Sequence, residues 1–191
     1  MERQIVETAD GSHSLFVPEL NEHYHSRHGA IQESRHVFIE MGYRKKISSN
    51  STLKILEIGF GTGLNAFLTA LEGPQSSGDV EYWAVEAYPL TNLELSMLNY
   101  PALLGLEDAQ KVWEGIHSAN WESLTTISPT FKLCKRHAKI EEFQLDSPVD
   151  LIYFDAFAPE KQPELWTVAI FEKMFQLLHP GGLLTTYCAK G

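Results

Sequence analysis

The sequence of 191 residues has no apolar stretch that approaches the roughly 20 residues of a membrane span. Its first residues, MERQIVETADGSHS, are charged and polar, which is unlike a signal peptide. It has only two cysteines, Cys134 and Cys188, and they do not form a CxxC pair. We therefore expect a cytoplasmic protein with no membrane association, in which both cysteines are small buried residues of strands.

Basic residues are also few. The chain has 15 Lys and Arg against 25 Asp and Glu, a formal net charge of -10. This charge argues against indiscriminate binding to nucleic acid, which depends on clustered Lys and Arg, but it leaves room for a local basic patch. The dense basic runs are 43–47 and 132–139, and each alone is best interpreted as a solvated face.

From Leu53 onward, apolar runs alternate with amphipathic stretches, which predicts strands alternating with helices. Such alternation favours an α/β fold, a doubly wound and mostly parallel sheet of the Rossmann-like type. The predicted strands are 53–61, 80–88, 131–138, 149–157 and 183–190, and the predicted helices are 64–72, 89–98 and 163–178, with a turn at 73–79 and a helix stop at 179–182.

The first part of the chain differs in character. We treat residues 1–52 as an N-terminal cap segment and residues 53–191 as the core, within one compact unit. The cap begins with short extended pieces and continues with a helix around 30–41. It either closes a pocket over the carboxyl ends of the strands or covers one face of the sheet.

Three glycines, Gly59, Gly61 and Gly63, follow the first predicted strand in the stretch LEIGFGTGLN. A phosphate-binding P-loop would need Gly-Lys-Ser/Thr, and no lysine follows here. A dinucleotide site would need G-x-G-x-x-G, whereas Asn65 stands beyond a G-x-G-x-G spacing. The string E-x-G-x-G-x-G resembles motif I of class I S-adenosylmethionine-dependent methyltransferases, which implies that Glu57 helps to hold the ammonium group of that cofactor.

The second predicted strand ends at Glu86, where a carboxylate accepts both hydroxyls of a ribose; a solvated carboxylate is the alternative. The third strand has no acidic residue at its end to hold an adenine amino group. The backbone of His137 or Ala138 would have to do so, while Glu141 and Glu142 are unplaced candidates.

Asp155 follows the apolar strand VDLIYF, at the edge where open α/β sheets bind ligands. Methyl transfer requires an aligned nucleophile, and an amine attacks only after it loses a proton. Asp155 suits the role of proton acceptor, although a turn or N-cap aspartate is the alternative interpretation. Phe157, Tyr153 or Trp166 would pack against a base or shield the cation.

The strings GFGTGLN, YFDAFAPEKQPELWT, PGGLLTTYCAKG and YHSRHGAIQESRHVF resemble the tRNA 5-methylaminomethyl-2-thiouridine methyltransferase family, the methyltransferase part of MnmC and its stand-alone relatives. The resemblance implies the cofactor S-adenosylmethionine and methylation of 5-aminomethyl-2-thiouridine at the tRNA wobble position. It places the three glycines and Glu86 at the cofactor, Asp155 at the substrate amine, and Tyr24 in the lining of the cofactor pocket.

The sequence departs from the family in two respects. It has no room for the flavin-dependent oxidase domain of bifunctional members, and it ends where stand-alone members continue, so we expect a chain truncated at its C-terminus that lacks some strands. The histidines of HYHSRH, 23–28, have no supporting Cys or Asp cluster, and we expect no metal. Two alternatives stay open: an aminopropyl transferase of the spermidine-synthase type and a non-catalytic binding module.

Overall fold

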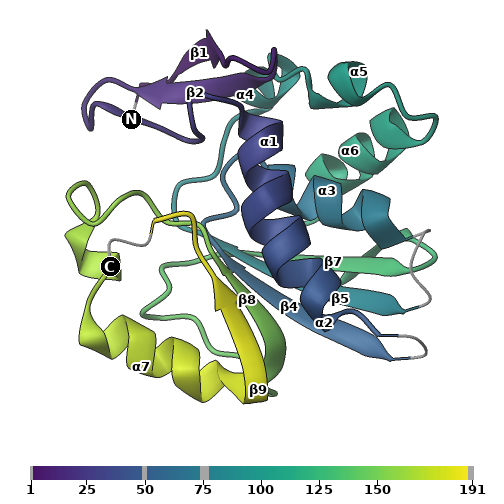
Figure 1. Cartoon of the computed structure of the whole chain (residues 1–191), viewed down its shortest axis with the longest axis vertical. Coiled ribbons are helices and arrows are strands. Elements are labelled where there is room, and N and C mark those ends of the chain that lie inside the picture. The colour runs from purple at the N-terminus through teal and green to yellow at the C-terminus, as the bar shows by residue number, and fades with distance from the viewer. Residues whose placement is uncertain (1, 49–50, 74–77, 189–191) are drawn as a thin grey trace.

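The structure is a computed structural model that describes residues 2–48, 51–73 and 78–188. Its centre is a six-stranded sheet with the strand order β6-β7-β5-β4-β8-β9 (Figure 1). The bounds of these strands are Thr52–Ile58 for β4, Asp79–Glu86 for β5, Thr125–Ser128 for β6, Phe131–His137 for β7, Val149–Phe154 for β8 and Leu178–Thr185 for β9.

The pairing confirms the predicted fold class. Strands β4, β5, β7, β8 and β9 pair in parallel, and only β6 at the edge is antiparallel to its neighbour. The chain starts at the middle of the sheet with β4, builds outward to β5 and β7, and returns to the other side of β4 with β8 and β9. This reversal next to β4 is the kind of switch point at which open α/β sheets hold their ligands.

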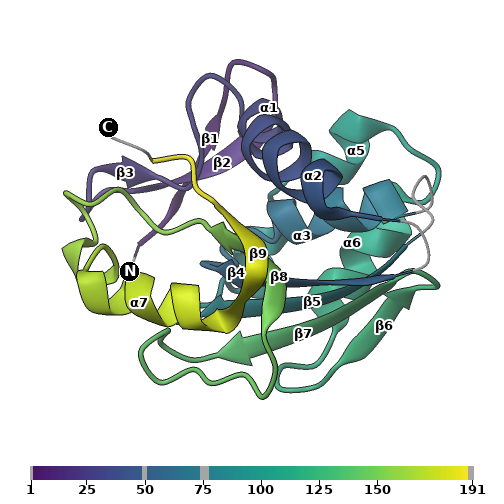
Figure 2. The same cartoon turned by 60° about the horizontal axis from the view of Figure 1, so that its bottom comes forward.

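Helices cover both faces of the sheet (Figures 1 and 2). One face carries α3 (Leu64–Glu72), α6 (Ala109–Ser118) and a long helix formed by α1 (Ala30–Ser34), the π-helical segment η1 (Arg35–Tyr43) and α2 (Arg44–Lys46). The opposite face carries α7 (Val168–Leu177). Two short helices, α4 (Asn92–Ser96) and α5 (Tyr100–Leu104), connect β5 to α6. Separate apolar clusters fill the two faces, as expected for strands that are buried on both sides.

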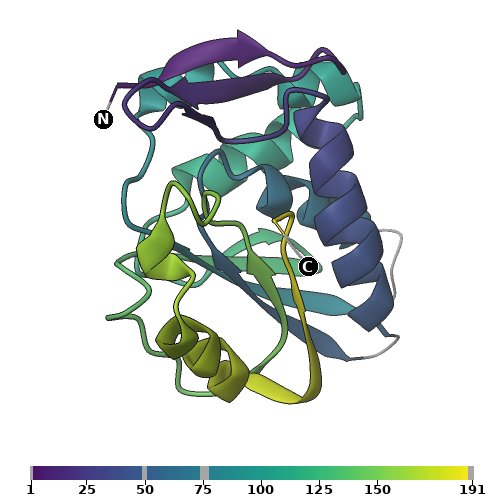
Figure 3. The same cartoon turned by 60° about the vertical axis from the view of Figure 1, so that its left-hand side comes forward.

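The N-terminal segment forms its own three-stranded antiparallel sheet, β1 (Gln4–Glu7), β2 (His13–Val17) and β3 (Glu22–His23). Figure 3 shows it at the end of the molecule above the central sheet, followed by the long helix. The predicted extended pieces and helix are therefore present. The segment covers one face of the sheet and also reaches the carboxyl ends of the strands. The helical segment η1 packs on β8 and β9, and the turn after β3 lies at those strand ends.

Three local predictions need correction. The helix predicted over 163–178 is a short 3-10 turn, η3 (Pro163–Leu165), and then α7, because Thr167 caps α7 by accepting a hydrogen bond from the backbone of Ile170. The predicted helix stop at 179–182 lies inside β9, an edge strand in which a proline is tolerated. Cys188 is half-buried and lies beyond β9, whereas Cys134 is buried in β7 as expected.

Residues 74–77 of the predicted turn, and 189–190 of the last predicted strand, lie outside the described residues. Within the described ranges, none of the helices combines the length and apolar character needed to cross a bilayer.

Candidate active site

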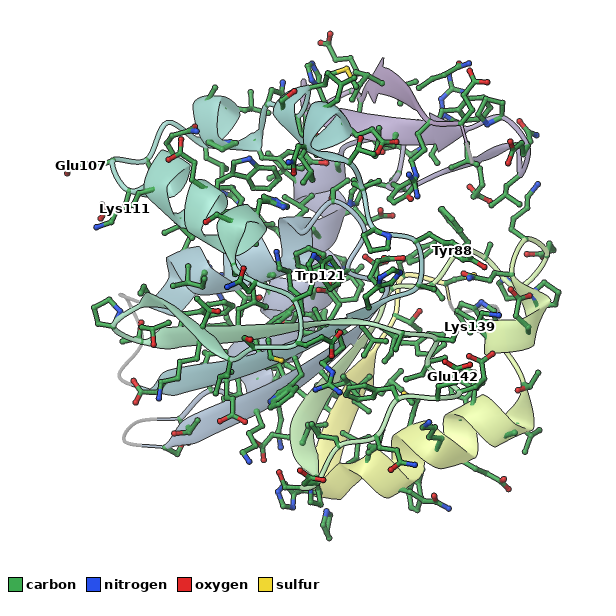
Figure 4. The ribbon with its side chains drawn as sticks, turned by 180° about the vertical axis from the view of Figure 1, so that it is seen from behind. Tyr88, Glu107, Lys111, Trp121, Lys139 and Glu142 are labelled. Atoms are coloured by element: carbon green, nitrogen blue, oxygen red, sulfur yellow. The ribbon has the colours of Figure 1, made fainter. Side chains whose placement is uncertain are left out.

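A pocket of about 260 Å³ opens at the carboxyl ends of β4, β5 and β8. Seven of the predicted site residues line it: Tyr24, Gly59, Gly61, Glu86, Ala138, Asp155 and Phe157. Figure 4 shows two further lining residues, Tyr88 and Lys139, near each other on one side of the molecule, far from Glu107 and Lys111. The structure thus brings together residues from the ends of β4, β5, β7 and β8 and from the N-terminal segment.

The glycine-rich turn has little room for side chains. Gly59 has φ +87°, and a Cβ there would lie 2.4 Å from the backbone oxygen of Asp155. Gly61 has φ +49°, and its Cβ would lie 3.1 Å from Cδ1 of Tyr24. Gly63 lies away from the pocket, at the N-cap of α3 against Phe60 and His117. Glycine is therefore required by the fold itself at Gly59, and it leaves bare backbone at the pocket wall.

Glu86 stands at the end of β5 with both carboxylate oxygens bound to backbone. Oε2 accepts from the N–H of Gly61 at 2.8 Å, and Oε1 accepts from the N–H of Tyr88 at 2.8 Å. These bonds fix the carboxylate in the pocket, and each oxygen keeps a further lone pair for a ligand.

Asp155 follows β8, and its backbone N–H donates to the carbonyl of Ile58 at 2.9 Å. In its side chain, Oδ2 accepts from Nδ2 of Asn65 at 2.8 Å. Burial raises the pKa of Asp155 to about 7; the hydrogen bond from Asn65 opposes this, and the charges of Glu33 and Glu86 add to it. A carboxyl that titrates near neutral pH and opens to a pocket is suited to accept a proton.

Glu57 does not line the pocket. Its side chain is completely buried behind Asn65, where Oε1 accepts from Nδ2 of Asn65 at 2.9 Å. Among the described residues Oε2 has no hydrogen-bond partner of normal geometry, although the Tyr82 hydroxyl is close enough to lower the pKa of the Glu57 carboxyl. Burial outweighs this and raises that pKa well above its usual range. This position gives no support to the predicted contact with a cofactor ammonium group.

Two aromatic side chains, Tyr24 and Phe157, line the same pocket as Asp155. The rings of Tyr24 and Phe157 meet edge to face, with centroids 5.2 Å apart. Arg3 holds Tyr24 by donating to its hydroxyl at 2.9 Å, and the same guanidinium donates to Glu94 at 3.1 Å and to the carbonyl of Tyr88 at 2.8 Å. Arg3 thereby fastens the N-terminal segment to the chain that follows β5, beside the pocket.

Trp166 and His137 lie outside the pocket lining. Trp166 supports the loop after β8 from behind: its Nε1 donates to the carbonyl of Phe157 at 2.7 Å, and its ring packs on Phe154 and Phe171. His137 is exposed, and its neighbour Ala138 is the residue of that pair that reaches the pocket. A backbone role at an adenine ring therefore stays a prediction for Ala138.

Several lining residues were not found from the sequence, among them His25, Asn65, Lys139, Ile140 and Tyr187, while Glu141, an unplaced candidate, also lines the pocket. Asn65 belongs to the motif string GFGTGLN, which is the signal that could have identified it. His25 and Tyr187 likewise belong to the quoted strings YHSRHGAIQESRHVF and PGGLLTTYCAKG, whereas nothing in the local pattern of Lys139 and Ile140 distinguishes them.

Lys135 corrects the interpretation of the run 132–139 as a solvated face. Its side chain is buried, and Nζ donates to the carbonyls of Ile116 and His117 at 2.9 and 3.0 Å, at the end of α6. Burial lowers the pKa of this lysine to about 8.

Within the described ranges, no group of three or more His, Cys, Asp or Glu residues is placed to hold a metal ion. Of the histidines in 23–28, His25 is buried between Ser14 and Thr62.

Comparison with known proteins adds to this geometry. Residues 106–191 match a family model described as S-adenosyl-L-methionine-dependent methyltransferase. The bifunctional protein MnmC of tRNA 5-methylaminomethyl-2-thiouridine biosynthesis from Pseudomonas fluorescens is 32% identical over 183 residues, and its counterpart from Ralstonia nicotianae is 29% identical over 179 residues. Each match covers 88% of this chain but 27% of the relative, so the chain spans about a quarter of the length of these relatives.

The crystal structure of MnmC2 from Aquifex aeolicus has the same fold, with a TM-score of 0.76 and 24% identity over 98% of this chain and 60% of that one. The chain is therefore similar in sequence to the MnmC proteins over 88% of its length, and it shares the fold of MnmC2.

Proposed function

We propose that the chain transfers a methyl group to the primary amine of 5-aminomethyl-2-thiouridine, or of its 2-oxo counterpart, at the wobble position of tRNA. One observation carries the proposal. Asp155, with a pKa near 7, opens into the pocket beside the bare backbone of Gly59, in a chain related to MnmC.

The pocket fits S-adenosylmethionine in its chemistry. Bare backbone at Gly59 and Gly61 admits close approach of an amino acid and a ribose, and Glu86 offers lone pairs to ribose hydroxyls. The wall at Ala138 and Ile140 is apolar, as an adenine ring requires. When bound, the cofactor supplies an electrophilic methyl group on a sulfonium.

Asp155 would prepare the amine. A primary amine is mostly protonated at neutral pH, and its lone pair is blocked until that proton leaves. The carboxylate of Asp155 would hold the ammonium group by a charge-assisted hydrogen bond, accept its proton and keep the nitrogen in place. Tyr24 and Phe157 would enclose the nitrogen and keep water out. The sites proposed for the ligands are Gly59, Gly61, Glu86 and Ala138 for the cofactor and Asp155 and Phe157 for the substrate nucleoside.

The net charge of -10 favours a compact contact with tRNA over broad coverage of its backbone. Lys139 and Lys161 line the pocket and are placed to meet phosphates near a base that enters it. The acidic remainder of the chain would disfavour non-specific contact.

The test uses the chain, S-adenosylmethionine with a labelled methyl group, and tRNA from cells that lack this methylation. Mass analysis of the digested nucleosides should show the methylaminomethyl product. Asp155→Asn should lower the turnover number by about 100-fold or more, because the proton acceptor is lost, while calorimetry shows cofactor affinity that is little changed.

Glu142→Gln is a control, since it removes a carboxylate that does not line the pocket. It should leave turnover intact. Failure of the parent chain to form the product, or unchanged turnover in Asp155→Asn, would contradict the proposal. Aminopropyl transfer from decarboxylated cofactor to a diamine would favour the spermidine-synthase alternative.

A further inference from the structure

Asn65 joins two acidic side chains at the floor of the pocket. It lies in the first turn of α3, and its Nδ2 donates to Oε1 of Glu57 at 2.9 Å and to Oδ2 of Asp155 at 2.8 Å. The hydroxyl of Ser34 donates to Oδ1 of the same amide. Both hydrogens and the oxygen of the amide are therefore engaged, and Asn65 is almost completely buried.

This arrangement fixes which way the amide points. If the amide were turned over, its oxygen would face two acidic groups and its nitrogen would face the Ser34 hydroxyl. Glu57 opposes that rotation, because its Oε1 accepts from the same Nδ2 that donates to Asp155. Glu57, which does not line the pocket, therefore helps to orient the Asn65 amide whose Nδ2 donates to Asp155.

We infer that Glu57 and Asn65 are positioning residues for Asp155: Glu57 orients the amide of Asn65, and Asn65 holds one oxygen of Asp155 and leaves the other for the substrate amine. The inference rests on the proposed function, in which Asp155 accepts a proton. Among the described residues no hydrogen bond to Oδ1 of Asp155 is found, which leaves that oxygen for the ligand.

The electrostatic surroundings explain why such a donor is needed. The titratable groups that face Asp155 come from several elements, namely Glu33 on α1, Glu57 on β4, Tyr82 and Glu86 on β5, and Tyr187 after β9. Each of these side chains is either neutral or negatively charged, so none of them stabilises the ionised form of Asp155. Burial and the charges of Glu33 and Glu86 raise the pKa of Asp155, and the hydrogen bond from Asn65 opposes them.

The experiment compares pH profiles of turnover for the parent chain and four variants. Asn65→Leu and Glu57→Leu should move the acidic limb to higher pH by about one pH unit and lower turnover at pH 7 by about fivefold, with cofactor affinity kept within about twofold. Glu57→Gln should resemble the parent, because its amide oxygen still accepts from Asn65 and its nitrogen can donate to the Tyr82 hydroxyl.

Thr69→Val is the matched control. The Thr69 hydroxyl donates to the backbone carbonyl of Asn65 at 2.7 Å and is equally buried, but it does not touch the amide. Its loss should leave the pH limb in place. If Glu57→Leu does not fold, Asn65→Ser carries the same prediction, since serine is too short to reach both carboxyls.

A second readout needs no tRNA. The difference in unfolding midpoint between the parent and Asp155→Asn changes with pH where Asp155 titrates in the folded state. When Asn65→Leu is added to both chains, that change should move to higher pH. An unmoved transition, or a loss of cofactor affinity in Glu57→Gln, would overturn the inference. A parent chain without methyl transfer would instead contradict the proposed function.

Discussion

At the scale of single residues, the buried Asp155 carboxylate that would accept the proton of the amine also lowers the stability of the folded chain when it is ionised. Burial raises the pKa of its carboxyl from 3.8 to about 7, so the folded chain holds a proton there that the unfolded chain has already lost at pH 5. Stability from this group is present below pH 4, is lost as pH rises towards 7, and changes little above that. The ionised form lowers the free energy of unfolding by up to roughly 4 kcal/mol, and by less where solvent in the pocket stabilises the charge.

Asp155→Asn should therefore stabilise the chain at pH 8, although it lowers the proposed methyl transfer by about 100-fold or more. The neutral amide still accepts from Asn65 and is not ionised at any of these pH values. We expect the unfolding midpoint of the variant to exceed that of the parent at pH 8 and to approach it at pH 4, by calorimetry. A variant that is less stable at pH 8 would show that other contacts of the carboxylate outweigh its burial.

At the scale of elements, the turn between β4 and α3 must lie against the end of β8. Gly59→Ala places a methyl group 2.4 Å from a backbone oxygen and in a backbone conformation of φ +87°, so the two strand ends must separate. We expect a loss of about 3 kcal/mol or more in the free energy of unfolding, and loss of cofactor binding.

Gly105→Ala is the matched control for that turn. Its φ is +61°, but a Cβ there meets nothing within 4 Å, so it carries backbone strain without a clash. We expect a loss of only about 1 kcal/mol, measured by urea unfolding. Equal losses in the two variants would mean that strain alone, and not the approach of β8, requires glycine at position 59.

At the scale of the whole molecule, buried neutral histidines predict sensitivity to acid. Burial lowers the pKa of His25 to about 4 and that of His117 to about 3. Unfolding exposes both rings, which then take up protons below about pH 6.5. Stability is fully present above that pH and falls as the pH drops through the range between 6.5 and these lower values.

His117→Phe should flatten that fall. Nε2 of His117 has no partner among the described residues, and the ring packs against Phe60 and Trp113, so an apolar ring replaces it at small cost. We expect the variant to match the parent at pH 8 and to be more stable at pH 5, by urea unfolding across this range. Parallel pH curves for the two chains would show that His117 is not the sensitive group.

The sequence alone predicts the order of β4, α3, β5, β7, β8, α7 and β9, because burial on both faces requires continuous apolar runs such as Leu151–Phe154, but it does not predict α6 or β6. It also predicts that Gly59, Glu86 and Asp155 lie at one edge, because parallel strands end together. Tertiary structure alone decided which charged side chains reach that edge. Glu57 turns to Asn65 and Lys135 to the end of α6, and both choices depend on neighbours supplied by distant segments of the chain. A local pattern records that a residue is polar, but its partner, and therefore its charge and role, is set by packing.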